Sequence, residues 1–174
     1  MRILFLILCL ANIVVAVVMI RWMPDPMAIH FGHGGLPNNF ASPVGYAVLI
    51  SGLVVFFAVL FLAMPWLLRV LPVSWISLPH CIFWMNEENR PRTTRRVGAF
   101  MASIGAATMV LFLLMQWLTF QANRATPVQL NMPIFLCVFT GFLAVFTTLT
   151  VRFGLSFRRP KKPGEDHDGH TPQT

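Results

Sequence analysis

The sequence predicts an all-α integral membrane protein with four transmembrane helices. Of its 174 residues, 56% are hydrophobic and only 11% are charged, whereas soluble domains carry about 25% charged residues. The chain contains four continuous apolar runs, each long enough to cross about 30 Å of hydrocarbon as a helix. These runs lack the alternating pattern of barrel strands, the other structure that satisfies the backbone in lipid.

The four helices are expected at about residues 3–22, 44–68, 97–120 and 132–151. The first run exceeds the roughly 7–15 apolar residues of a signal peptide and lacks an A-x-A cleavage pattern, so it is expected to be a retained anchor. Pro91 fits only the first turn of a helix, so the third helix should begin near Asn89 or Arg90. The helices would form one domain over residues 1–157. The polar tail at 158–174 should be disordered.

The basic residues predict the orientation of the helices. One side of the membrane would receive eleven of them: Arg2, Arg69, Arg90, Arg92, Arg95, Arg96, Arg152, Arg158, Arg159, Lys161 and Lys162. The other side would receive only Arg21 and Arg124. The positive-inside rule then places both termini in the cytoplasm, with residues 23–43 and 121–131 on the outer face. Because the basic residues flank apolar runs, the net charge of +7 does not indicate nucleic-acid binding.

The cytoplasmic loop from Arg69 to Arg96 is aromatic first and basic last. Trp75 and Trp84 are suited to the headgroup region, where amphipathic rings collect. The segment "RPRTTRR" at 90–96 is expected to attract anionic lipid, at about 1 kcal/mol per basic residue, or to act as a topology signal alone.

The helices carry few groups that could do chemistry. None of the apolar runs holds an ionisable residue away from its ends, which argues against ion-coupled transport. Counted from the helix ends, Asn12 and Gln116 differ in depth by about 9 Å, so they are not expected to bond each other. Gln116 matches the depth of Ser51, where an interhelical hydrogen bond is expected. The sequence shows no nucleophile–base pair, no paired carboxylates within the membrane runs and no phosphate-binding loop, so neither an enzyme nor a cofactor is expected.

Small residues predict where the helices pack. A stripe of them would let another helix approach the third one closely: Gly98, Ala102, Gly105 and Ala106. The three cysteines, Cys9, Cys81 and Cys137, form no CxxC pair and are expected to be apolar packing residues.

The outer loop at 23–43, "MPDPMAIHFGHGGLPNNFASP", is expected to adopt one compact conformation. Its prolines favour an extended or turning chain, and its glycines allow backbone angles closed to other residues. A contact between Asp25 and His30 would order it. Asp25, His30 and His33 are also metal-competent, although two histidines and a carboxylate are a weak zinc signature.

Three segments of the chain carry a resemblance to a known family. The outer loop resembles "LPDxIPxHFxxxGxPDxxxSK", with matches at Pro24, Asp25, Ile29, His30, Phe31, Gly35, Pro37 and Ser42. The inner loop "ISLPHCIFWMNEENR" resembles "INLPNKxYWLxPERR", with matches at Ile76, Leu78, Pro79, Trp84, Glu88 and Arg90. "FQAN" at 120–123 is similar to a third feature. These patterns resemble domain of unknown function 1648, from the N-terminal half of bacterial SdpI-type immunity proteins. Asn38 and Pro43 stand where that family has an acidic residue and a lysine.

The resemblance implies a four-helix protein of undefined biochemistry in the bacterial cytoplasmic membrane. Proteins of the SdpI type protect the producing cell from a secreted membrane-active toxin and sequester a repressor at the membrane. The expected function is therefore a non-enzymatic envelope sensor or protection protein that acts through its outer loop. Its expected partners are lipid, a peptide toxin or regulatory protein, and other copies of itself. The alternative is an outward-facing metal or small-ligand binding or transport protein built on Asp25, His30 and His33.

Overall fold

The computed structural model describes residues 1–76 and 80–157 of the chain. Within these ranges, four helices are long and apolar enough to cross a membrane: α1 (Arg2–Met19), α2 (Pro43–Val70), α4 (Arg90–Arg124) and α5 (Met132–Leu155). The four predicted helices are therefore confirmed, and they fit a multi-pass membrane protein. Helix α4 begins at Arg90, as its first-turn proline predicts. The expectations for Leu78, Pro79 and the tail at 158–174 lie outside the described residues.

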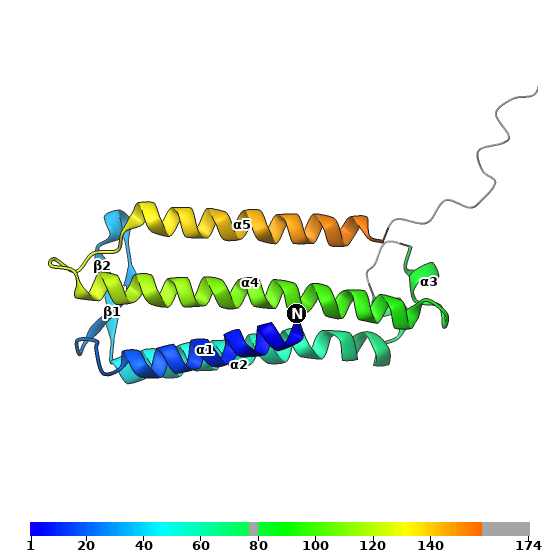
Figure 1. Cartoon of the computed structure of the whole chain (residues 1–174), viewed down its shortest axis with the longest axis horizontal. Coiled ribbons are helices and arrows are strands. Elements are labelled where there is room, and N and C mark those ends of the chain that lie inside the picture. Colours follow the sequence, from blue (N-terminus) through cyan, green and yellow to red (C-terminus); the bar gives the residue numbers. More distant parts are fainter. Residues whose placement is uncertain (77–79, 158–174) are drawn as a thin grey trace, which may run out of the picture.

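The helices are arranged around α4, which is the longest. Figure 1 shows α5 along one side of α4, and α1 together with α2 along the other. At the helical rise, the 35 residues of α4 extend about 52 Å and the 18 residues of α1 only about 27 Å. Helix α1 therefore begins partway along α4, and α2 and α4 continue past it.

The chain between α1 and α2 forms a β-hairpin, which the all-α prediction did not include. Strands β1 (Met27–Phe31) and β2 (Pro37–Ala41) pair antiparallel and are joined by the 3-10 turn η1 (His33–Gly35). The first pair is Met27 with Ala41, and the last is Phe31 with Pro37. We call residues 27–41 the hairpin.

The two ends of the bundle are named for what they contain. The hairpin end contains the hairpin. The opposite end, which we call the basic end, contains α3 (Cys81–Trp84), the short 3-10 turn η2 (Val73–Trp75) and the start of α4.

Short polar side chains start the helices that leave the hairpin end. The hydroxyl of Ser42 accepts a hydrogen bond from the backbone N–H of Gly45, 3.0 Å away, and Pro43 occupies the first turn of α2. Asn131 accepts in the same way from Ile134 and caps α5, which also carries a proline in its first turn. Both helices thus begin with a capping side chain followed by proline. The cap satisfies a backbone N–H of the first turn, and proline has no N–H to leave unpaired there.

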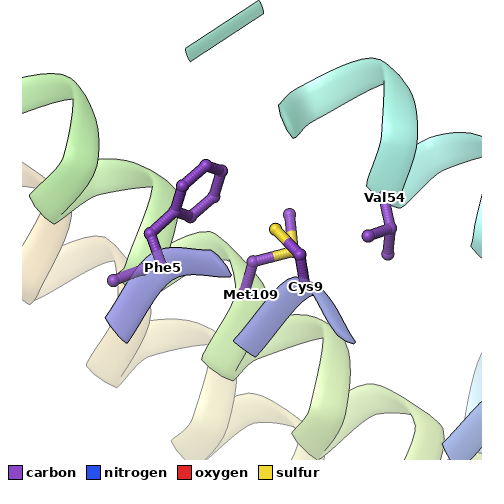
Figure 2. Packing of buried hydrophobic residues seen from close by; sticks show 5 residues of the cluster. Phe5, Cys9, Val54 and Met109 are labelled. Carbon is purple, nitrogen blue, oxygen red and sulfur yellow. The ribbon is translucent and has the colours of Figure 1, made fainter. Parts of the chain in front are cut away.

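The bundle core lies where α1, α2 and α4 meet (Figure 2). Phe5 and Met109 are fully buried there, and Cys9 packs beside them as expected. Gly105 makes this possible, because a Cβ on it would lie 2.8 Å from the ring of Phe5. The predicted stripe of small residues on α4 is buried, namely Gly98, Ala102, Gly105 and Ala106. By contrast, α5 has no buried residue, and Cys137 on it is exposed.

The prediction that Asn12 and Gln116 do not bond each other is wrong. Nε2 of Gln116 donates to Oδ1 of Asn12 at 2.8 Å, and both side chains are fully buried. Asn12 lies seven residues before Met19, where α1 ends, and Gln116 lies eight residues before Arg124, where α4 ends. The depths therefore match. The depths predicted from the sequence were wrong because α1 ends three residues sooner, and α4 four residues later, than hydropathy indicates.

Candidate functional site

The hairpin is clamped to the last turns of α4 by one side chain. Oδ1 of Asn123 accepts from the backbone N–H of Ala28 at 2.7 Å, and its Nδ2 donates to the carbonyl of Ala28 at 2.9 Å. Ala28 is 1% exposed, so neither backbone group has access to bulk water. Asn123 thus makes the hydrogen bonds that a neighbouring strand would make. Without it, the buried N–H and carbonyl of Ala28 would have no hydrogen-bond partner.

The turn of the hairpin is held by the loop between α4 and α5. The backbone N–H of Leu130 donates to the carbonyl of Gly35 at 2.9 Å, and Nε2 of Gln129 donates to the carbonyl of Gly34 at 2.9 Å. Gly35 has a φ of +78°, and a Cβ on it would overlap the carbonyl oxygen of Leu130. Only glycine fits at this position. The two loops at this end therefore form one connected structure.

His30 is ordered by a partner other than the expected one. Its Nδ1–H donates to Oδ1 of Asn38 across the hairpin, at 2.6 Å. The expected contact with Asp25 is replaced by this bond. Asn38 also lies against Gly32, where an added Cβ would be 3.0 Å from Nδ2 of Asn38. In the motif that the outer loop resembles, the position of Asn38 is acidic. In this chain the side chain bonded to His30 is therefore a neutral amide.

The other matched residues of the outer loop have positions that build the hairpin. Pro24 and Asp25 are exposed in the bend between α1 and β1. Phe31 is half-buried and pairs with Pro37 at the end of the strands, and Ser42 caps α2. Ile29 packs on a cluster that joins the hairpin to both neighbouring helices: Met19, Met27 and Tyr46.

The metal hypothesis gains no support from this arrangement. Among the residues that the structure describes, no three His, Cys, Asp or Glu side chains are close enough together to hold a metal ion. This includes Asp25, His30 and His33, of which His30 is engaged by an amide.

The hairpin presents exposed apolar side chains. Asn123 occupies the outer edge of β1 at Ala28, and Oδ1 of Asn39 accepts from the backbone N–H of Phe40 on β2 at 2.9 Å. Leu36 is 58% exposed and Phe40 50% exposed. A partner of this surface would therefore meet apolar side chains.

The inner motif residues join the helix ends at the basic end. The guanidinium of Arg90 donates to the backbone carbonyls of Leu68, Arg69 and Leu71, at 3.0–3.2 Å. It therefore caps the C-terminus of α2, where a cation is favoured. Glu88 is exposed beside it.

Trp84 is buried between the helix ends at the basic end, where it is only 4% exposed. Its Nε1–H donates to the carbonyl of Phe157 at 2.9 Å, and Thr93 donates to the carbonyl of Trp84 at 2.8 Å. The guanidinium of Arg96 lies 5.1 Å from the centre of its ring. Trp84 thus ties the end of α5 to the start of α4. Trp75, by contrast, is 76% exposed, and the headgroup location of these two rings stays a prediction.

Sequence reasoning missed the role of Asn123. The signal was present in "FQAN", which we had singled out only as a third segment of the resemblance. No family model, curated protein or solved structure matches the chain. The resemblance to domain of unknown function 1648 therefore stays a prediction.

Proposed function

We propose that this protein is a non-enzymatic membrane protein that uses the hairpin as a recognition cap on the outer face of the bacterial cytoplasmic membrane. In this proposal it senses envelope stress or protects the cell from membrane-active peptides, as the resembled SdpI-type proteins do.

The observation that carries the proposal is the construction of the hairpin end. The segment with the most specific sequence is a shaped surface fixed at several points, with hydrogen bonds from Asn123, Gln129 and Leu130. Fixing a loop before binding lowers the entropy lost when a partner docks. Exposed Leu36 and Phe40 on the hairpin supply apolar contact area for such a partner. A lipid-facing role alone would not need a clamp made of buried hydrogen bonds.

The proposal is tested by survival of a deletion strain challenged with a panel of membrane-active peptides. The strain is complemented with the wild type, with Phe40→Ala on the hairpin, or with the matched control Phe139→Ala on α5. Both phenylalanines are exposed, at 50% and 41%. Rescue by the wild type and by Phe139→Ala, with loss of rescue by Phe40→Ala at equal protein level, supports the proposal. If deletion changes survival against no peptide, the protection function is refuted.

A second variant separates the shape of the cap from its surface chemistry. Asn123→Ala removes the clamp without changing any exposed apolar side chain. If the cap must be preformed, this variant should lose most of its protection while remaining in the membrane. Full rescue by Asn123→Ala would show that the fixed hairpin is not what acts.

A further inference from the structure

A cleft of about 910 Å³ opens at the basic end, beside the first turn of α1. It is bounded by the first turn of α1, the last turn of α2 and the first turns of α4. The side chains that matter for its chemistry are Arg2, Arg69, Glu87, Arg90, Arg95 and Ala99. Four arginines face one carboxylate, so the cleft suits an anion.

One of the arginines is held in place, and a second lies close against α4. Arg90 is fixed by the backbone carbonyls at the end of α2. Arg2 lies over Gly98, close enough that a Cβ there would be 2.9 Å from its Nη2. The first turns of α1 and α4 contain no acidic residue and no side-chain cap, so the partial positive charge of both helix starts adds to that of the arginines.

The distance of the cleft from the outer part of α4 is close to the thickness of the hydrocarbon core. Gly98, beneath Arg2, lies 22 residues before Phe120 on α4, which is about 33 Å at the helical rise. The hydrocarbon core is about 30 Å thick. If Phe120 marks one boundary of the hydrocarbon, Arg2 lies at the other, on the side that the positive-inside rule makes cytoplasmic.

A small notch with mostly apolar lining residues lies next to the cleft. This second cavity of about 50 Å³ shares Arg2, Gly98 and Ala102 with it, and is otherwise lined by residues such as Phe5 and Phe61. A basic cleft beside such a notch suits an amphiphile. A free phosphate ion would use only the first part.

We propose that this cleft binds the phosphate headgroup of an anionic membrane lipid. Arg2, Arg69 and Arg95 would contact the phosphate, as arginine forks commonly do, and the start of an acyl chain would enter the notch. The inference does not rest on the function proposed for the hairpin, which lies at the opposite end of the bundle.

The test measures lipid retained by the purified full-length protein in neutral detergent, by native mass spectrometry. The probes are phosphatidylglycerol, phosphatidylcholine and inorganic phosphate. Arg95→Gln removes one charge from the cleft, and Ala99→Leu narrows the cleft beside Arg95 while keeping every arginine. The matched control is Arg92→Gln, which removes an equal charge from an exposed residue of the same helix that does not line the cleft.

The proposal expects retention of phosphatidylglycerol over phosphatidylcholine. Arg95→Gln should weaken this retention about tenfold or more, the loss expected when one charge-assisted hydrogen bond to the phosphate is removed. Ala99→Leu should weaken it at least as much, and Arg92→Gln should leave it within about twofold of the wild type. Equal losses in Arg92→Gln and Arg95→Gln, or no loss in Ala99→Leu, would show general surface attraction and overturn the site. Saturable binding of phosphate that displaces no lipid would overturn the lipid as its ligand.

Discussion

The clamp between Asn123 and Ala28 gives the most quantitative prediction. In Asn123→Ala, the backbone N–H and carbonyl of Ala28 lose their partners, both in a residue that is 1% exposed. A buried polar group left unpaired costs about 1–3 kcal/mol. Two such groups are left unpaired, and water that enters the space of the truncated side chain offsets part of the cost. The hairpin should therefore be destabilised by about 3 kcal/mol. The bond from Asn123 to the carbonyl of Thr119 adds little, because that carbonyl is within a helix.

This cost should appear as local opening of the hairpin. A change of about 3 kcal/mol is roughly a hundredfold in an equilibrium constant. Amide hydrogen exchange at Ala28, measured in lipid nanodiscs, should therefore accelerate by about a hundredfold in Asn123→Ala. Exchange in the middle of α4 should not change.

The matched control is Gln129→Ala, which also loses a side-chain bond to the hairpin. Its bond reaches the exposed carbonyl of Gly34, where water replaces the lost donor, so exchange at Ala28 should change by about twofold or less. A change at Ala28 of less than about threefold in Asn123→Ala would refute the reasoning that this amide is the clamp. Equal acceleration in every helix would mean that the loss is global rather than local.

Further predictions concern the turn, the buried amides and the basic end. Gly35→Ala should release the hairpin to protease, whereas Gly34→Ala should do so much less, because both glycines have positive φ but only Gly35 has a neighbour within 4 Å of an added Cβ. A double-mutant cycle of Asn12→Leu and Gln116→Leu, followed by thermal unfolding in detergent, should give a coupling of about 0.6–1 kcal/mol; a coupling near zero would contradict the bond. Trp84→Phe should lose the indole N–H and part of the buried ring volume, lowering the free energy of unfolding by about 2–3 kcal/mol, and an unchanged value would argue against the indole donor.

The helices were predictable because each is encoded by a continuous apolar run. The start of α4 was also predictable, since Pro91 permits only a first-turn position. The ends that hydropathy could not locate were those where polar residues continue a helix, as in the last turn of α4 at Asn123 and Arg124. Together with the earlier end of α1 at Met19, that error moved Gln116 away from Asn12 in the predicted depths.

The candidate site was predictable as a shaped segment but not as a hairpin. Its strands have five residues each and are bordered by prolines and glycines, which read as a loop in sequence. Their stability comes from a side chain 95 residues away, through the bonds of Asn123 to Ala28. A local pattern contains no information about such a contact. The burial of Trp84 was not predictable for a similar reason, because its partner Phe157 is distant in the chain.

The most direct test of the central claim is the side of the membrane that the hairpin faces. Leu36→Cys, made with Cys81→Ser, places an exposed thiol on the hairpin, while the native Cys81 in the protein that keeps Leu36 reports on the basic end. Both proteins carry Cys137→Ser, because Cys137 is also exposed. Intact bacterial cells are treated with a membrane-impermeant maleimide. We predict labelling of Leu36→Cys in intact cells, and labelling of Cys81 only after permeabilisation. Labelling of Cys81 but not of Leu36→Cys in intact cells would place the hairpin in the cytoplasm and contradict its proposed function as an outer recognition cap.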